Sequence, residues 1–383
     1  MESYLELNPK ILDIAQAIHI RGGRALLVGG YVRDRLLGID SNDIDVEVFA
    51  LSLETLTEVL SQYGAVIEVG RAFGVLRVKG LNFDFSLPRI DSKVGIGHRG
   101  FDVVTDPNLD FKTAAKRRDV SINAMGFDPL TGEYLDPHGG REDLEQKVLR
   151  ATDPAHFAED PLRGLRVAQF AARFEMTADK QLLRLSSALA LDEIAPERIF
   201  GELQKLLIKG GRPSIGLKFL RQSTLIRFFP ELEALIDVKQ NPLWHPEGDV
   251  WTHTLMTIDA AARLRSQHSN DFALMLGALC HDFGKPEVTA TANGTLHAYG
   301  HDTRGALKAR HFLEKLRAPR QLVSQVEALV QHHLAPSQFI KNQAGAKAYR
   351  RLARKLASAG VDMTLLYQIS LADNLGRSTK EAL

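Results

Sequence analysis

Two acidic residues one position apart follow a pair of glycines near the start of the chain. The stretch LVGGYVRDRLLGIDSNDIDVEVF (27–49) carries Gly29 and Gly30 after one apolar run and Asp43 and Asp45 in a second. Side chains alternate between the two faces of a strand, so the two aspartates point the same way. Adjacent carboxylates repel each other unless they share a cation or a proton. Mg²⁺ takes oxygen ligands and keeps room for substrate phosphates, so the spacing predicts a Mg²⁺ site.

Other residues near this stretch fit the same chemistry. A glycine pair lets the backbone approach a phosphate closely, and Arg33 in the helix expected to follow adds a positive charge. Asp84 lies between Phe83 and Phe85, faces away from both rings, and is a candidate third carboxylate on a neighbouring strand. Either signal alone has a simpler explanation, a turn or a solvated strand face, but the two within one strand–helix–strand unit are more specific.

A second group of reactive side chains lies towards the C-terminus. Imidazole and carboxylate groups together suit a transition metal, Mg²⁺ or Mn²⁺. A single histidine is more often a core or capping residue than a ligand, but several at helix ends and in loops predict a second metal site. The candidates are His253, His281, Asp282, His301, and His332 or His333.

The composition limits the class of protein. A length of 383 residues predicts two to four structural units, and an apolar fraction of 44% with 25% charged residues argues against disorder. The single Cys280 excludes an internal disulfide and fits a reduced, cytoplasmic setting. The first residues predict no secretory signal, and no apolar run reaches the roughly 18 residues of a membrane span. With a net charge of +1, a nucleic-acid role has to come from local basic patches.

The elements predict an α+β fold. Short apolar runs bounded by glycine or proline predict strands over 25–30, 43–50, 74–80 and 82–87, and an amphipathic pattern predicts a helix over 51–64. From about residue 142 the spacing is helical and strand signals nearly vanish. A small mixed head is therefore expected to precede a long all-helical body. The predicted helices cover 161–174, 196–210, 253–265, 303–317 and 321–333.

Two basic segments in the predicted body would suit RNA. Residues 196–227 carry seven Lys and Arg against two Asp and Glu, and 341–360 carry six basic residues and no acidic one. Phosphate contacts need such patches. A solvated helix face explains either patch equally well.

Four further motifs follow in order: KRRDVSINAM (116–125), LDPHGGREDL (135–144), EDPLRGLR (159–166) and PERIFGELQKLL (196–207). With the opening stretch, they resemble the class II tRNA nucleotidyltransferases, the CCA-adding enzymes and their poly(A) polymerase relatives. The resemblance implies a polymerase-β-like head that adds CCA to tRNA from CTP and ATP without a nucleic-acid template. It also implies Mg²⁺ at Asp43 and Asp45.

The resemblance assigns further residues to nucleotide binding. Arg117 and Arg118 would bind the triphosphate and Asp119 the ribose, with Asn123 a nearby polar candidate; alone, KRRD would read as a solvated basic turn. Asp160 and Arg163 share a helix face and would read the Watson–Crick edge of the base, next to Arg166. Locally, Asp160 before Pro161 also reads as a helix cap, and Arg163 as a partner of Glu159.

The segment 86–111 carries Gly95, Gly97 and Gly100 and resembles the family's flexible lever, which favours full CCA addition over A-only addition. The domains expected are a head (1–140), a nucleotide-selecting and tRNA-binding neck and body (141–240), and a third domain (241–383) after the Pro- and Gly-containing stretch 241–250. Both a monomer and a homodimer fit the sequence.

The histidine-rich part resembles the HD-domain metal-dependent phosphohydrolases, with Asp373 as the closing carboxylate and Mg, Mn, Ni or Fe as the metal. The resemblance implies a phosphatase or 2′,3′-cyclic phosphodiesterase activity that repairs blocked tRNA ends. The alternatives are an A-adding or poly(A) polymerase, and an RNA-binding protein with an inactive HD domain.

Overall fold

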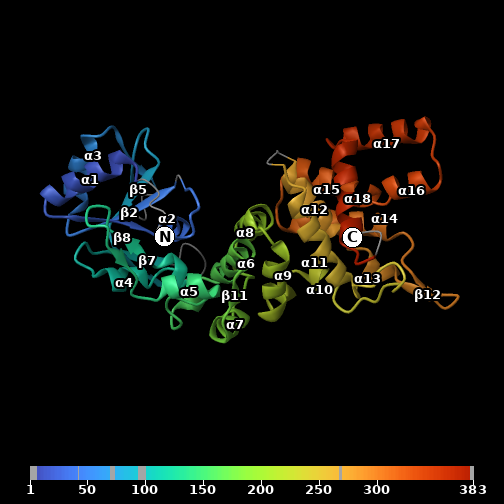
Figure 1. The fold of residues 1–383 in the computed structure, drawn as a ribbon, viewed down its shortest axis with the longest axis horizontal. Coiled ribbons are helices and arrows are strands. Elements are labelled where there is room, and N and C mark those ends of the chain that lie inside the picture. Colours follow the sequence, from blue (N-terminus) through green and yellow to red (C-terminus); the bar gives the residue numbers. More distant parts are fainter. Residues whose placement is uncertain (1–6, 42, 70–73, 94–100, 267–269, 380–383) are drawn as a thin grey trace. The chain divides into compact units, whose positions relative to one another are not determined.

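The computed structural model describes residues 7–41, 43–69, 74–93, 101–266 and 270–379, and separates the chain into two compact units (Figure 1). The first unit holds Met1–Arg163 and Ala178–Leu185, and the second holds Gly164–Thr177 and Ser186–Leu383. The division passes through helix α6 (Leu162–Phe174). The expected boundaries at 140 and 240 stay a prediction.

A seven-stranded mixed sheet forms the centre of the first unit, in the order β3-β4-β5-β2-β1-β8-β9. The four predicted strands are confirmed as β1, β2, β4 and β5, and the predicted helix as α3 (Leu53–Ser61). Strands β8 and β9 have two residues each, too few for a clear signal, and β3, which was also not predicted, is as long as β4 and β5 but mostly exposed. The bounds are β1 Arg24–Val28, β2 Ile44–Phe49, β3 Val66–Val69, β4 Val75–Val78, β5 Phe83–Ser86, β8 Gly126–Phe127 and β9 Tyr134–Leu135.

Strands β2 and β5 form the parallel pair of this sheet, and the register places Asp45 directly opposite Asp84. On the other side, β2 runs antiparallel to β1, with Asp45 opposite Val28. Opposed residues of neighbouring strands share a face. The expected position of Asp84 on a neighbouring strand is therefore confirmed.

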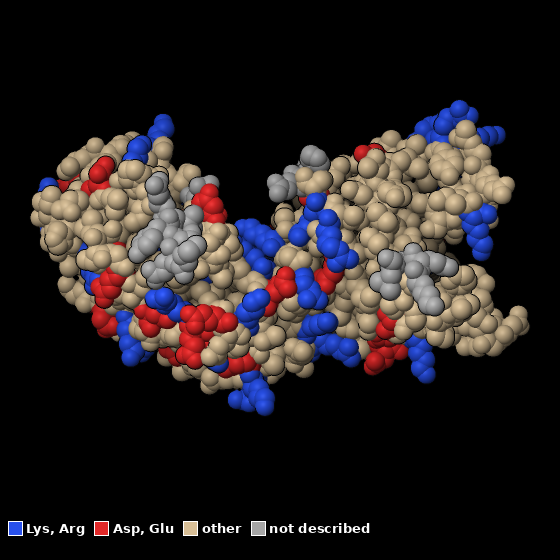
Figure 2. Space-filling model, in the orientation of Figure 1, with Lys and Arg blue, Asp and Glu red and all other residues tan. Residues whose placement is uncertain are grey.

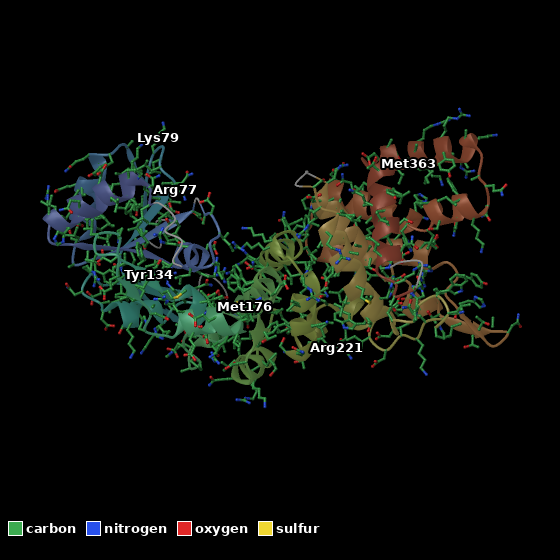
Figure 3. The ribbon with its side chains drawn as sticks, in the orientation of Figure 1. Arg77, Lys79, Tyr134, Met176, Arg221 and Met363 are labelled. Carbon is green, nitrogen blue, oxygen red and sulfur yellow. The ribbon has the colours of Figure 1, made fainter. Side chains whose placement is uncertain are left out.

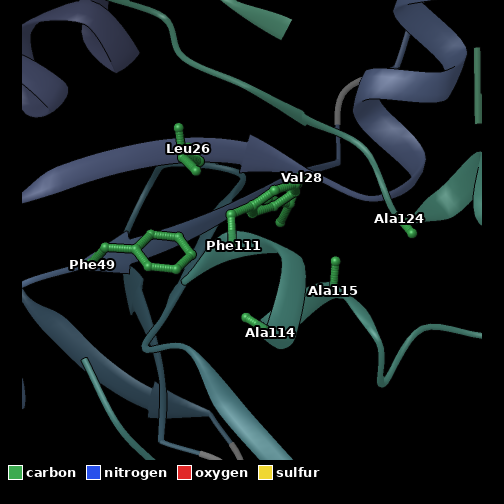
Figure 4. Packing of buried hydrophobic residues seen from close by; sticks show 7 residues of the cluster. All are labelled: Leu26, Val28, Phe49, Phe111, Ala114, Ala115 and Ala124. Carbon is green, nitrogen blue, oxygen red and sulfur yellow. The ribbon is translucent and has the colours of Figure 1, made fainter. Parts of the chain in front are cut away.

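The same face carries an apolar cluster farther along the strands (Figure 4). Leu26, Val28 and Phe49 pack against α4 (Phe111–Ala115), and Phe111 meets Phe49 edge-on with ring centroids 6.3 Å apart. Gly126 makes this packing possible, because a Cβ there would lie 2.7 Å from the Phe111 ring. Helices α1 (Pro9–Ile20) and α3 contact each other as well as the sheet.

Three smaller elements complete the part of the first unit used below. Helix α2 (Gly30–Leu36) follows β1 directly, and α5 spans Gly140–Gln146. Strands β6 (Arg89–Lys93) and β7 (Phe101–Thr105) pair as the arms of the predicted lever segment. The glycines that suggested its mobility lie outside the described residues.

The second unit is mainly helical, as predicted, and includes a hairpin of β12 (Ala290–Ala292) and β13 (Thr295–His297). All five predicted body helices are present, and α12 is buried over most of its length. No helix among the described residues is long and apolar enough to cross a membrane. The helices are α8 Pro196–Lys209, α9 Pro213–Gln222, α10 Pro230–Glu233, α11 Val250–Arg263, α12 Asp271–Cys280, α13 Lys285–Val288, α14 His301–Lys315, α15 Arg320–His332, α16 Ala335–Lys341, α17 Ala346–Ser358 and α18 Met363–Leu375, while α7 (Lys180–Ser187) crosses the division like α6.

The Phe111 contact predicts a stability effect confined to the first unit. Phe111→Ala leaves a cavity beside Phe49 and Gly126 and should lower the free energy of unfolding by about 3 kcal/mol. Urea unfolding followed by circular dichroism measures the change, with the half-exposed Leu130→Ala as a matched control that stays within about 0.5 kcal/mol. Equal midpoints for the Phe111→Ala protein and the unchanged protein would contradict this account of the core.

Candidate functional site

Three carboxylates gather where β2 and β5 begin. Asp43 and Asp45 are exposed, and Asp84 is half-buried beside Asp45. The pKa of Asp45 is raised, chiefly because surrounding protein displaces water and further because Asp43 and Asp84 repel its charge, while Arg118 opposes the shift. A divalent cation relieves repulsion between carboxylates, so the oxygens of these three side chains fit Mg²⁺.

Asp84 already has a cationic partner. Arg77 of β4, labelled in Figure 3, lies opposite it in register and donates from Nε and Nη2 to the two carboxylate oxygens, both at 2.5 Å. Such a bidentate pair holds both oxygens in place. A direct role for Asp84 in catalysis stays a prediction, and it would require Arg77 to move or to share the carboxylate.

A fourth carboxylate was not anticipated from the sequence. Glu47 lies on the same face of β2 as Asp45, is 0% exposed, and binds Arg117 Nη2 at 2.7 Å through Oε1. Its position two residues after Asp45 was a usable signal, but glutamate in an apolar strand gives no hint of complete burial. The pair attaches the KRRD segment to the strand that carries Asp43 and Asp45.

Arg118 lies beside the glycine loop. Its Nη1 is 2.6 Å from where a Cβ on residue 29 would sit, and Gly29 has a φ of +73°, which favours glycine. Burial and the neighbouring Arg117 lower the pKa of Arg118 to about 10, so it stays charged at neutral pH. The Arg118 guanidinium and the Asp45 carboxylate therefore both lie close to the backbone of Gly29.

The remaining head candidates form a buried network. Arg33 bonds Asp34 through Nε at 2.8 Å and also donates to Asn123, whose amide donates to Asp119 at 2.9 Å. Arg33 is 4% exposed. Its guanidinium therefore organises α2 against the KRRD segment. The nucleotide-binding roles of these residues stay predictions.

Asp160 and Arg163, which are expected to read the base, both form hydrogen bonds to the backbone of nearby segments. Asp160 Oδ1 accepts from Leu162 N at 3.1 Å, which is the capping contact noted from sequence, while Arg163 donates to the carbonyls of His156 (2.9 Å) and Arg117 (2.8 Å). Arg163 thereby ties this segment to the KRRD segment. Arg166 belongs to the second unit, where its guanidinium lies over the Phe170 ring.

The second unit brings predicted ligands together in two overlapping groups of facing side chains, one of His253, His281 and Asp282 and one of Asp282, His301 and His333. Asp282 is central: its oxygens lie 3.1 Å from His281 Nε2, 3.6 Å from His301 Nε2 and 3.8 Å from His253 Nε2. His301 Nε2 also faces His333 Nε2 at 3.3 Å, and His253 Nε2 faces Asp373 at 3.0 Å. His281, Asp282, His253, His333 and Asp373 are all buried. We call these residues, with His301, the histidine cluster.

Backbone carbonyls fix which nitrogen of each ring faces the cluster. The Nδ1 atoms of His281, His301 and His333 lie 2.7 Å from the carbonyls of Ala278, Ala298 and Val330, one helical turn upstream in the first and last cases. Nδ1 then carries the proton, and Nε2 is left as a lone-pair donor. His281 Nε2 is buried and has no hydrogen-bond geometry with Asp282, as expected for two ligands of one cation.

The protonation states of His333 and Asp282 also suit a cation, whereas, despite burial, Asp373 and Glu247 raise the pKa of His253. Burial and the nearby His281 and His301 lower the pKa of His333 to about 4, which keeps its ring neutral. Burial alone would raise the pKa of Asp282, but its contacts with His281 and Lys285 hold it well below its usual range. Neutral imidazoles and ionised carboxylates are the forms that bind metals. The residues therefore fit a divalent metal, and the geometry does not select one.

Residues outside the predicted set support the cluster. Glu247 Oε1 lies 2.9 Å from His253 Nδ1 and bonds His245 Nδ1 at 2.8 Å. Lys285 contacts Asp282 at 2.7 Å, and Arg377 contacts Asp373 at 2.9 Å. A pocket of about 560 Å³ opens over Asp282, His301 and His333. These partners were not predicted, because a charged residue close to a candidate ligand in the sequence does not show which side chain it will contact.

Comparisons with known proteins agree with the site in the head and with the histidine cluster. Family profiles match the "Poly A polymerase head domain" at residues 25–150, the "Probable RNA and SrmB- binding site of polymerase A" at 180–236 and the "HD domain" at 250–374. A multifunctional CCA protein of Tolumonas auensis is 36% identical over 331 residues, covering 82% of this chain and 77% of the relative. One of Halorhodospira halophila is 34% identical over 371 residues, covering 93% and 84%.

Solved structures share the fold. A CCA-adding enzyme in complex with CTP aligns with a TM-score of 0.63 at 20% identity, over 98% of this chain and 81% of that one. The Thermotoga maritima CCA-adding enzyme complexed with tRNA aligns with a TM-score of 0.63 at 19% identity, over 99% and 81%. The expected fold class, a mixed head with a helical body that includes an HD domain, is confirmed.

Adjacent histidines give a matched test of the metal site. The structure brings His333 into the histidine cluster, whereas His332 is half-buried near Lys355 and Asp302. His333→Ala should lower the bound metal per chain and raise the metal dissociation constant by at least about tenfold, while His332→Ala should leave both unchanged. Elemental analysis after dialysis against Mn²⁺ or Ni²⁺ measures both variants. The reverse ranking would show that the wrong histidine has been assigned.

Proposed function

The chain belongs to the family of multifunctional CCA proteins, and on this premise we propose that it adds CCA to the 3′ end of tRNA, using CTP and ATP and releasing pyrophosphate. One observation carries the proposal: Asp43 and Asp45 open a strand whose neighbour holds Asp84, and Gly29 and Arg118 border them. This combination of paired carboxylates, open backbone and fixed cation suits a nucleoside triphosphate with its Mg²⁺.

In each step the terminal RNA hydroxyl attacks the α-phosphorus of the incoming nucleotide. The new bond joins the 3′ oxygen to that phosphorus, the bond to the bridging oxygen breaks, and pyrophosphate leaves. Bound Mg²⁺ at Asp43 and Asp45 would lower the pKa of the hydroxyl and neutralise charge on the triphosphate. Phosphoryl transfer depends mainly on positioning and electrostatics, so few other groups have to act chemically.

The arginines would position the triphosphate. Arg118 lies beside the loop that the phosphates would approach, and Arg117 is held by buried Glu47. A planar guanidinium offers several fixed donors to phosphate oxygens. Asp119 would bind the ribose from its network with Asn123.

Base selection would come from Asp160 and Arg163. Arg163 has five N–H donors, and those not used on the carbonyls of His156 and Arg117 can meet the base. The bond from Arg163 to the Arg117 carbonyl would hold the base-reading segment at a defined distance from the phosphate-binding segment. An acceptor and a donor side by side match the amino and ring-nitrogen groups that cytosine and adenine share.

RNA would follow basic helices. The segment 196–227 forms α8 and α9, where Arg221 is labelled in Figure 3, and Figure 2 shows Lys and Arg side chains gathered over α17. The α17 cations are all exposed, and none is matched by an acidic residue of that helix: Lys347, Arg350, Arg351, Arg354 and Lys355. Exposed cations of this kind supply salt-dependent affinity for phosphates.

The histidine cluster would hydrolyse phosphate esters at damaged RNA ends. Water attacks the phosphorus, the ribose oxygen leaves and takes up a proton, and a metal held by the cluster would lower the pKa of that water. The inactive RNA-binding alternative is less favoured because both carboxylate sites are intact. The A-only polymerase is less favoured because the relatives described above are multifunctional CCA proteins. The cytoplasmic setting, the use of ATP and the oligomeric state remain predictions.

The first test supplies tRNAs that end before the first C, the second C or the A with one nucleotide at a time. CMP, CMP and AMP should be added in that order. Asp45→Asn removes a Mg²⁺ ligand charge and should slow both additions on the order of 10³-fold, about 4 kcal/mol of transition-state stabilisation. Exposed Asp40→Asn is the control and should add CCA normally. Incorporation of neither nucleotide by the unchanged protein would refute the proposal.

Glu47 allows a separate test of triphosphate positioning. Glu47→Gln keeps the size of the side chain but removes the charge that holds Arg117, so the KM for CTP should rise about tenfold with a smaller change in kcat. Steady-state kinetics on a tRNA lacking CCA measures both, and Glu47→Asp should recover part of the loss. Glu133→Gln, which breaks an exposed pair with Arg24, is the control. A fall in kcat and thermal stability with an unchanged KM would make Glu47 purely structural.

A further inference from the structure

The pocket over the histidine cluster has an aromatic rim that the metal chemistry does not need. Trp244, His297 and Tyr299 line this pocket together with Asp282 and His301. Trp244 is 57% exposed and Tyr299 is 79% exposed. Single exposed aromatics are common, but two that border the pocket of a buried metal-ligand cluster call for an explanation.

The rim is held in place by local structure. The His297 and Tyr299 rings stack with centroids 4.9 Å apart and planes 10° from parallel, so His297 supports one face of Tyr299. The turn before Trp244 is closed by bonds from Trp244 N (3.1 Å) and His245 N (2.9 Å) to the Asn241 carbonyl. Glu247 Oε1 bonds His245 Nδ1 and lies 2.9 Å from Nδ1 of His253 in the histidine cluster. The rim and the cluster are therefore parts of one assembly.

The chemistry of the pocket changes from one end to the other. At the inner end lie Asp282, His301 and His333, with Lys285 bonded to Asp282 at 2.7 Å and to Gln240 at 2.6 Å. At the outer end lie exposed aromatic faces. A volume of about 560 Å³ lies within the range of small-ligand sites. A phosphate group suits the inner end, and a flat apolar ring suits the outer end.

We propose that Trp244 and Tyr299, with Tyr299 supported by His297, form a stacking subsite for the terminal base of an RNA whose ribose phosphate reaches the histidine cluster. This rests on the proposed phosphohydrolase function and adds to it how the substrate is held. Unpaired RNA bases are bound by stacking on aromatic rings, and every base has a stacking face. The subsite should therefore accept all four terminal bases with similar affinity.

The chain offers a built-in reporter for this binding. It has two tryptophans, Trp244 and Trp251, and Trp251 is 2% exposed within α11. Both indoles belong to the second unit, and the first unit contains no tryptophan of its own. Quenching of the exposed indole by adenosine 2′-phosphorothioate, a slowly hydrolysed probe, therefore reports on the rim, and Trp244→Phe should abolish the signal.

The decisive comparison is between Tyr299 variants of the full-length, metal-loaded protein. Tyr299→Ala should raise the Kd for the probe about tenfold, the size expected for losing one stacked base, while Tyr299→Phe should bind normally. Ribose 2-phosphate, which lacks a base, should bind equally to all variants in competition with the probe. Tyr367→Ala, which removes a 57% exposed tyrosine from α18, is the matched control. Unchanged affinity of Tyr299→Ala for the nucleotide would overturn the subsite.

Measuring the hydrolysis of RNA 2′-phosphates with and without a terminal base tests the subsite and the phosphohydrolase function separately. If neither an RNA 2′-phosphate nor an abasic one is hydrolysed, yet Tyr299→Ala still weakens binding of the nucleotide probe, the subsite stands and the phosphohydrolase proposal falls. If both substrates are hydrolysed equally well by the unchanged protein and by Tyr299→Ala, the phosphohydrolase stands and the subsite falls. Loss of kcat/KM confined to the base-bearing substrate supports both.

Discussion

The head depends on the register between β2 and β5. Pairing these strands in parallel sets Asp45 opposite Asp84, with Asp43 nearby and Glu47 farther along the same face. A one-residue slip would turn the acidic residues of β2 into the apolar layer, so the hydrophobic pattern of Ile44, Val46 and Val48 enforces the register. The same pattern that folds the sheet therefore concentrates negative charge at one edge, and the remaining parts of the head balance that charge.

The arginines that balance this negative charge differ in how deeply they and their partners are buried. Arg77 holds Asp84 from an exposed position, whereas Arg117 is held by fully buried Glu47, and Arg118 is largely shielded beside Gly29. Breaking a buried pair leaves an uncompensated charge, so the Glu47 pair resists opening more than an exposed pair does. Arg117 thus has a fixed place before any nucleotide arrives, and less of its side-chain entropy is lost when phosphates bind.

Much of both sites was predictable from the sequence, and the limit has a physical basis. Alternation placed Asp43 and Asp45 on one face, and helix-end positions suggested His253, His281 and Asp282. Long-range partners were not predictable, because the bonds from Glu47 to Arg117 and from Arg77 to Asp84 depend on which strands become neighbours. The choice between His332 and His333 likewise depends on where α15 ends. Short strands such as β8, at two residues, leave no periodicity to read.

The two proposed reactions use different nucleophiles, an RNA hydroxyl in the head and water at the histidine cluster. Nucleotidyl transfer needs an RNA hydroxyl to attack in preference to water, so arginines fixed around the triphosphate serve positioning. Phosphate hydrolysis needs water itself to attack, so a compact set of imidazoles and carboxylates that holds a metal is suitable. In the histidine cluster, backbone carbonyls at Nδ1 and the carboxylate of Glu247 orient the rings. Arginine, which cannot lose its proton, and histidine, which can be neutral, are therefore not interchangeable between the two sites.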